Sequence, residues 1–392
     1  MLHFIFIEWI RKIFAMKPIA ENRIVDFIKK EAVMLISAAA AIVSSIFVRL
    51  SPADYIACID YKVIACLFCL MLVVCGFNEL ELFDIAAKRA IALCPNLRRL
   101  AFAIVFITFF SSMLITNDVA LITFVPLSLV LLSSFEIKTI IYIVVMQTVA
   151  ANIGSSLTPV GNPQNLYIFS FYRLAPASFF AVTVPFVLFG GLLIFLSLLF
   201  LPKLEVDTSQ CKSTSKLNIK KLSLYILWFI LSVAAVFNWT SYIAVFAVIS
   251  ATALAANPKL FKSVDYSLLI TFSAFFIFVE NISSIESIRL FLNGMLARNT
   301  MLISALTSQF ISNVPAAVLL SGFTQNSTQL LLGVNVGGCG TLIASLASVI
   351  SYKLFSQKHI KYVGLYIIVF SAVNAIFLVV LSTFAYFYPL KL

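Results

Sequence analysis

The feature that most constrains this chain is a series of apolar stretches that recurs along almost its whole length. Most of these stretches are close to or within the length of about 17–25 residues that a helix needs to cross a hydrocarbon core about 30 Å thick. Only 11% of the residues are charged, whereas soluble domains carry about 25%. Because lipid cannot hydrogen-bond to the backbone, apolar segments of this kind must be helical. The sequence therefore predicts an all-α polytopic membrane protein.

The apolar segments form two sets with the same order of events, separated by a polar stretch. In each set, two spans lead to an amphipathic stretch, a hairpin-like pair, a segment interrupted by polar residues and a closing span. This is a repeat of architecture rather than of residues, as transporter repeats usually are. The predicted parts are an N-terminal interfacial segment, a first transmembrane repeat, a cytoplasmic linker, a linking span and a second repeat, at residues 1–31, 32–201, 202–221, 222–240 and 241–386.

Parity relates the two halves. Each half crosses the membrane four times if its hairpin returns to the side from which it came, so the extra span at 222–240 starts the second half on the opposite side. We therefore expect two inverted repeats, each with a re-entrant hairpin and a broken transmembrane helix. Hairpin arms of about 15–17 residues rise about 23–26 Å, which favours re-entry, but two short spans joined by a turn fit the same pattern.

The basic residues test this topology, because Lys and Arg are enriched in short cytoplasmic loops. With a cytoplasmic N-terminus, 21 of the 27 basic residues fall inside, and six fall outside: Arg49, Lys62, Arg173, Arg289, Arg298 and Lys391. We expect a multi-pass protein of the bacterial inner membrane. The net charge of +11 then reflects topology and contact with anionic lipid, not nucleic acid.

Four polar interruptions lie deep in apolar sequence, where non-helical backbone survives only if protein buries it or it lines a watery cavity. The first, Thr116-Asn117-Asp118, holds the one ionisable side chain that we place near the bilayer centre. Burying a carboxylate there costs at least about 2.5–3.5 kcal/mol, so a cation or a proton must offset it. The alternative is that Asp118 only caps the second hairpin arm, and the two roles are compatible.

The other three interruptions follow the same logic. In NIGSSLTPVGNPQN, at 152–165, two prolines must break the helix. The freed carbonyls can ligate Na⁺, and the positive end of the next half-helix can face an anion; the alternative is a plain proline kink. SNVP at 312–315 and GVNVGGCGT at 333–341 repeat the order of the first two. The glycines of the last run could instead allow close helix packing.

The segments TNDVALITFVPL, NIGSSLTPVGNPQNL, SNVPAAVLLSG and GVNVGGCGTLIASLAS resemble the four signature segments of the ion transporter superfamily, and the likeness runs from about residue 32 to 386. That group includes arsenite permeases, citrate-type carboxylate transporters, dicarboxylate/sulfate symporters and one branch of Na⁺/H⁺ antiporters. The likeness is greatest to the citrate-transporter-like and arsenite-permease branch. It implies that the hairpin tips and the broken helices form one central site, and the dicarboxylate relatives imply a homodimer.

The resemblance also implies roles for individual residues. Those facing the substrate would be Asn117, Asn162, Pro163, Asn165, Asn313 and Thr341. Each half would hold one Na⁺-type coupling site, and the charge of Asp118 adds that residue to the set: Thr116, Asp118, Asn152, Gly154, Ser155, Ser156, Ser312, Gly337, Gly338 and Gly340. Na⁺ is the only metal expected, and no further cofactor is expected.

The hairpin tips depart from the dicarboxylate branch, in which both read Ser-Asn-Thr. Here the first reads Thr-Asn-Asp and the second Ser-Asn-Val. The first therefore adds a negative charge and the second lacks a hydroxyl, which argues against a dicarboxylate substrate. The Asn-Asp pair is closer to the arsenite-permease and Na⁺/H⁺ antiporter branches.

The function expected is secondary active transport of a small anion or oxyanion, of the carboxylate or arsenite type, coupled to Na⁺ or H⁺. The alternative is a Na⁺/H⁺ antiporter in which Asp118 is the shared binding group. The sequence contains no HExxH, GxSxG or GxxxxGK[ST] motif, which disfavours an intramembrane enzyme and coupling to ATP. A passive channel is also disfavoured, because inverted broken helices suit alternating access.

Overall fold

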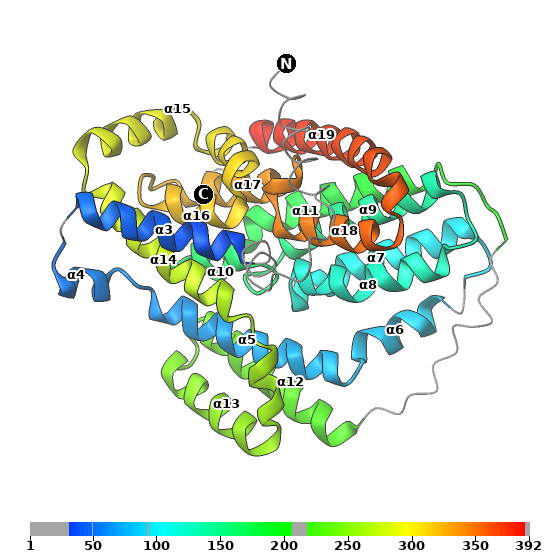
Figure 1. Ribbon diagram of the computed structural model, residues 1–392, viewed down its shortest axis with the longest axis horizontal. Helices are drawn as coiled ribbons and strands as arrows, with labels where there is room; N and C mark the ends of the chain where they lie inside the picture. Colours follow the sequence, from blue (N-terminus) through cyan, green and yellow to red (C-terminus); the bar gives the residue numbers. More distant parts are fainter. Residues whose placement is uncertain (1–30, 49, 92–93, 206–217, 389–392) are drawn as a thin grey trace, which may run out of the picture.

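The computed structural model describes residues 31–48, 50–91, 94–205 and 218–388 (Figure 1). Over these ranges the chain is helical, with no strand beyond an isolated bridge between Asn96 and Glu205. Seven of its helices are long and apolar enough to cross a membrane. The predicted all-α membrane fold is therefore confirmed, while the predicted interfacial segment and most of the predicted linker lie outside the described residues.

The helices of the two halves follow the same order. Those of the first half are α3 (Ala32–Phe47), α4 (Pro52–Ala57), α5 (Tyr61–Glu79), α6 (Leu82–Ile91), α7 (Leu97–Ile115), α8 (Asn117–Leu131), α9 (Ile137–Ser155), α10 (Pro163–Phe171) and α11 (Pro176–Leu198). After α12 (Ile219–Val236), the second half has α13 (Tyr242–Ala256), η2 (Pro258–Ser263), α14 (Tyr266–Ser283), α15 (Glu286–Ile311), α16 (Asn313–Ser321), α17 (Ser327–Gly337), η3 (Leu342–Ala344), α18 (Leu346–Lys358), η4 (Ile360–Tyr362) and α19 (Val363–Phe387). The opposite orientation of the halves stays a prediction.

The helices α5 and α14 begin in the same way. The side chain of Asp60 accepts a hydrogen bond from the backbone N–H of Val63, and that of Asp265 accepts one from Leu268, both at 3.0 Å. Each aspartate thereby satisfies one of the N–H groups that a helix start leaves unpaired. The two helices therefore share a local start signal, Asp-Tyr, that lies in the sequence itself.

Each hairpin turns at a single residue. Thr116, between α7 and α8, has φ 70° and ψ 151°, and Ser312, between α15 and α16, has φ 76° and ψ 154°. Positive φ is costly for residues other than glycine, by about 1–3 kcal/mol, so each tip is a strained point that the surrounding structure must hold. The two tips adopt the same strained conformation, which makes them structural equivalents.

The second hairpin is short. Asn299 interrupts α15 with a non-helical φ of −164°, and its side chain caps the second part by accepting a hydrogen bond from the N–H of Leu302 at 2.9 Å. The opposite arm, α16, has 9 residues and so rises only about 14 Å, about half of a hydrocarbon core. This length supports the predicted re-entry of the second hairpin.

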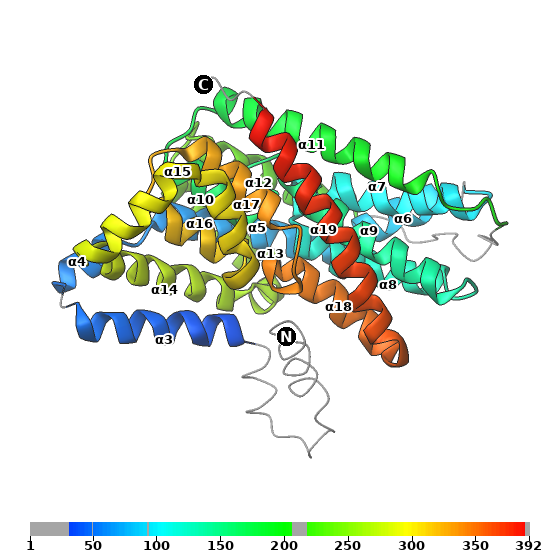
Figure 2. The ribbon, with the colours of Figure 1, turned by 90° about the horizontal axis from the view of Figure 1, so that it is seen from above.

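The first helices of each half pack against the other half. Helix α3 lies along α14 in both views (Figures 1 and 2), and α5 packs against α12 and α13. Hydrogen bonds also join α3 to α14, because the Asn281 amide donates to the hydroxyls of Ser44 and Ser45, at 2.9 Å each. The two halves are therefore interlocked, not merely adjacent.

Helix α9 runs through the interior. Almost every side chain from Ile140 to Ser155 is buried, and its neighbours include α7, α8, α18 and α19. A helix that is apolar on all sides belongs in such a position. It delivers the interrupted segment that follows Ser155 to the centre of the molecule.

Candidate functional site

Each interrupted segment lies between the end of one helix and the start of the next. Helix α9 ends at Ser155 and α10 begins at Pro163. The Asn162 side chain caps α10 by accepting a hydrogen bond from the N–H of Asn165 at 2.9 Å. Proline at the first helical position costs nothing, because its missing N–H would be unpaired there anyway. In the second half, α17 ends at Gly337 and α18 begins at Leu346.

The Asn152 side chain connects the two interrupted segments and one hairpin tip. Its Oδ1 accepts hydrogen bonds from Asn117 Nδ2 at 3.0 Å and from Ser345 Oγ at 2.9 Å. Its Nδ2 donates to the carbonyl oxygen of Gly338 at 3.0 Å. Asn117 and Asn152 were both predicted site residues, and the structure brings them into direct contact in the buried centre.

A second buried asparagine, Asn335, makes the matching connection from the second half. Its Oδ1 accepts hydrogen bonds from Ser156 Oγ at 2.9 Å and from Asn162 Nδ2 at 3.3 Å. Its Nδ2 donates to Asn165 Oδ1 at 2.8 Å and to the carbonyl of Leu331 at 2.9 Å. Asn335 therefore joins three predicted residues, yet it was missing from the prediction.

We expect Asn335→Leu to lower the free energy of unfolding by several kcal/mol. The substitution leaves the buried partners of the carboxamide unpaired, and each such group costs about 1–3 kcal/mol. Thermal unfolding of the purified protein measures the effect. The matched control is Asn374→Leu. Asn374 is also buried, in α19, but within the described residues it bonds only to its own helix, and its Oδ1 has no partner there. A neutral Asn335→Leu would show that the connection does not hold the site.

A sequence signal for Asn335 exists. NIGSSLT, at 152–158, and NVGGCGT, at 335–341, share the pattern Asn-x-Gly-x-x-x-Thr. The threonines act alike: Thr158 donates to the carbonyl of Met113 at 2.5 Å, and Thr341 donates to that of Gln309 at 2.9 Å. Met113 and Gln309 each stand three residues before their hairpin tip. The repeat thus extends from architecture to residues at the site, contrary to our expectation.

The glycines of this pattern pack against the hairpin arms. A Cβ added to Gly154 would lie 2.2 Å from the carbonyl oxygen of Phe109, and one added to Gly337 would lie 2.6 Å from Ser308 Oγ. A side chain fits at neither position. Close packing, the alternative that we considered for the glycines of the second half, is therefore part of the arrangement, and it brings their backbone to the hairpin.

A cavity of about 280 Å³ lies beside the first tip, bordered by Thr116, Asp118, Asn162, Pro163 and Asp265 among others. A smaller adjoining cavity of about 130 Å³ shares Asp118, Pro163, Asp265 and the first residue of α18, Leu346, and adds Ser312 of the second tip. Both hairpin tips and both half-helix starts therefore border one connected region. No Lys or Arg is among the described residues that line it.

Asp118 is the chemically distinctive group of this region. Its Oδ1 is buried and has no hydrogen-bond partner within the described part of the chain. No backbone N–H there bonds to its carboxylate, so the capping role is not observed. The Asp265 carboxylate, which caps α14, lines the same two cavities. Glu31 also lines the smaller cavity, so three acidic residues border a region that has no described cationic side chain.

The other predicted residues divide into two groups. Most are buried around the two asparagine connections: Gly154, Ser155, Ser156, Asn165, Asn313, Gly337, Gly338 and Gly340. Two of the predicted carbonyl ligands already accept hydrogen bonds, Gly338 from Asn152 and Gly337 from Gln309. Thr341 is exposed, lines neither cavity and bonds to Gln309 instead.

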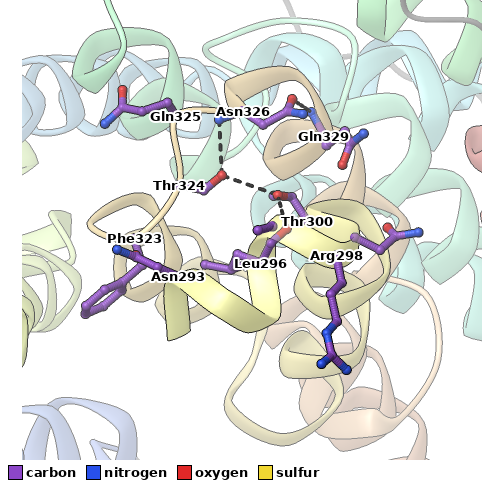
Figure 3. A pocket seen from close by; sticks show the side chains of 11 residues that line it. Asn293, Leu296, Arg298, Thr300, Phe323, Thr324, Gln325, Asn326 and Gln329 are labelled. Atoms are coloured by element: carbon purple, nitrogen blue, oxygen red, sulfur yellow. Dashed lines mark hydrogen bonds between the residues drawn. The ribbon is translucent and has the colours of Figure 1, made fainter. Parts of the chain in front are cut away.

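A separate pocket of about 380 Å³ lies between the interruption in α15 and the loop before α17 (Figure 3). Its walls carry amides and hydroxyls that already have partners. The Thr324 hydroxyl pairs with that of Thr300 and accepts from the backbone N–H of Asn326, whose side chain accepts from the N–H of Gln329. The guanidinium of Arg298 points away from Thr324 in Figure 3. Since none of the predicted site residues lines this pocket, it is not the candidate site.

Comparison with known proteins gives consistent matches. The citrate transporter family matches residues 9–331. An uncharacterized transporter of Methanocaldococcus jannaschii is 35% identical over 86% of this chain and 92% of its own length. The inner membrane protein YbiR of Escherichia coli is 33% identical over 81% of this chain and 86% of its own length. The silicon efflux transporter LSI3 of Oryza sativa is 29% identical over 44% of this chain and 35% of its own length.

Proposed function

Since the chain belongs to the citrate transporter family, and is thus a membrane transporter, we propose that it carries a small anion or oxyanion by secondary active transport coupled to Na⁺ or H⁺. The observation that carries the proposal is the cavity region that both hairpin tips and both half-helix starts border, with the unpaired Asp118 carboxylate at its wall. We further propose a cytoplasmic N-terminus in the bacterial inner membrane.

The charges of the cavity-lining residues limit the class of substrate that the cavity can bind. A tricarboxylate would meet three acidic residues, Glu31, Asp118 and Asp265, and no described Lys or Arg. Like charges repel strongly where the local dielectric constant is low. A small oxyacid that enters with its protons avoids this repulsion, and its hydroxyl groups can donate to carboxylate and amide oxygens. The rice relative, a silicon efflux transporter by name, agrees with a substrate of this class.

The coupling role falls to Asp118. An unpaired carboxylate away from water is unfavourable, so binding of a proton or Na⁺ lowers the free energy of the loaded state. Thr116 and Asn117 stand beside it at the same tip and supply neutral oxygens. Coupling follows because the substrate and the ion occupy neighbouring positions and each reduces the cost of binding the other.

The second candidate function is Na⁺/H⁺ antiport, in which Asp118 binds the two cations alternately and no oxyacid is carried. The observation that favours it is the same unpaired carboxylate Oδ1. The two functions differ in one respect, since only the antiporter moves protons in response to Na⁺ when no oxyacid is present.

The test uses the full chain reconstituted in liposomes, with uptake of arsenite, silicic acid, citrate and succinate measured under an imposed Na⁺ or proton gradient. We expect gradient-driven uptake of an oxyacid at least about tenfold above protein-free liposomes, with citrate the poorest substrate. Uptake of none of the four by a folded, reconstituted protein would count against the proposal. A proton flux driven by Na⁺ alone would instead establish the antiporter.

A further inference from the structure

The Gln309 side chain sits in the gap between the second hairpin and the second interrupted segment. Gln309 lies on α15, three residues before the tip at Ser312. Its Nε2 donates to the carbonyl oxygens of Ala305 and Gly337 at 2.9 Å each, and approaches that of Cys339 at 3.3 Å. Three carbonyl oxygens from two separate segments thus converge on one nitrogen atom.

The oxygen atom of the Gln309 amide also contacts the second interrupted segment. Gln309 Oε1 accepts a hydrogen bond from the N–H of Thr341 at 2.9 Å. Gly340 has a φ of +135°, and a Cβ at that position would lie 2.1 Å from Gln309 Oε1. Only glycine allows this conformation and this close approach. The segment 337–341 is therefore shaped around the Gln309 amide.

The first half lacks this arrangement. The residue equivalent to Gln309 is Met113, which offers no donor on the hairpin side of the segment. The amide of the first half comes from the opposite side, because Asn165 on α10 donates to the carbonyls of Ser156 and Thr158 at 3.0 and 3.2 Å. The position equivalent to Asn165 in the second half is Ser348, whose buried hydroxyl has no partner within the described residues.

Converging carbonyl oxygens from unwound helix are the ligands that a transporter offers to Na⁺. In the second half, the carbonyls of Gly337 and Cys339 already meet the positive hydrogens of the Gln309 amide on the side of the hairpin, and a cation bound between hairpin and segment would have to displace them. In the first half the amide of Asn165 lies on the opposite side of the segment, so the hairpin side holds no amide donor at the equivalent position. We propose that the Gln309 amide takes the place of a coupling ion in the second half, so that only the first half binds one. The consequence for transport, a single coupling ion per cycle, rests on the function proposed above.

The test exchanges the amide. In Gln309→Glu, a carboxylate oxygen faces the three carbonyl oxygens, so a cation is needed to bridge them. In Gln309→Met, the gap is filled by methionine, the residue that the first half has at the equivalent position, Met113. Purified full-length protein is unfolded thermally across a NaCl titration, with choline chloride holding the ionic strength constant. We expect Na⁺ to raise the midpoint of both variants by about 2–4 °C more than that of the wild type.

The control is Gln325→Glu, which adds the same charge at an exposed glutamine outside this arrangement, and which should follow the wild type. If Gln309→Glu does not fold, Gln309→Met carries the test. A Na⁺ response no larger than that of the wild type in the folded variants overturns the inference. The titration needs no transport, so a protein that carries no tested oxyacid can still gain the Na⁺ response, and the two proposals fail separately.

Discussion

Asp118→Asn should abolish transport driven by a cation gradient and leave the protein at least as stable as the wild type. The Oδ1 atom of this carboxylate is buried and has no hydrogen-bond partner in the described structure, and an uncompensated charge at membrane depth costs at least about 2.5–3.5 kcal/mol. Asparagine keeps the shape and removes the charge, so it relieves that cost but can no longer take up a proton or attract Na⁺. We expect a fall in gradient-driven uptake of at least about 100-fold, with an unchanged or higher unfolding midpoint.

The matched control is Asp60→Asn. Asp60 starts α5 as Asp265 starts α14, it lines neither cavity of the site, and asparagine caps helices as well as aspartate does. Its uptake should stay within about twofold of the wild type. Liposomes loaded with a pH-sensitive dye add a second measurement, a Na⁺ pulse without oxyacid. Retained coupling in Asp118→Asn would remove Asp118 from the mechanism.

Gly154→Ala should prevent the first interrupted helix from packing and leave little folded protein. The added Cβ would lie 2.2 Å from the Phe109 carbonyl oxygen and 2.6 Å from Ser112 Oγ. A side chain can rotate away, but the carbonyl belongs to the backbone of α7, so the whole hairpin arm must move. Overpacking usually costs about 1–3 kcal/mol, and we expect at least the upper end here, because Gly154 and the α7 residues that it meets, Phe109 and Ser112, are all buried.

The control for this substitution is Gly294→Ala. Gly294 is also helical, but an added Cβ meets nothing within 4 Å, so alanine should be neutral or stabilise the helix by up to about 1 kcal/mol. The yield of monodisperse protein after detergent extraction and the thermal midpoint measure both variants. Equal yields for the two variants would contradict the close approach of α9 to α7.

The membrane fold could be predicted because lipid imposes a simple rule on the sequence. Apolar length fixes the spans, and any polar run inside them must be explained. The turn at Thr116 and the break before Pro163 were predictable for this reason. The second hairpin is the shorter one, because Asn299 caps the helix that continues to the tip and thereby shortens the arm.

The site was predictable in part. The interruptions marked the segments, the family resemblance implied roles for Asn117, Asn152 and Asn162, and the structure places all three in the buried centre. Asn335 was missed because the two halves were compared by the order of their segments, not residue by residue. Asp265 could not be predicted, since a helix-starting aspartate looks the same whether it faces water or a cavity. In the sequence, Gln309 looks like an ordinary polar residue of a hairpin arm, because only the structure identifies its hydrogen-bond partners.

The packing of α3 along α14 has a consequence for biogenesis. During synthesis, α3 leaves the ribosome long before α14 exists, and α5 likewise waits for α13. Contacts between segments so distant in sequence form late. The nascent first half must therefore remain in the bilayer while the hydroxyls of Ser44 and Ser45 donate only within α3, to the Ala41 carbonyl, and still lack the Asn281 donor. A chain truncated after the first half would leave that polar face of α3 uncovered, so incomplete synthesis would persist as an exposed polar face in the membrane.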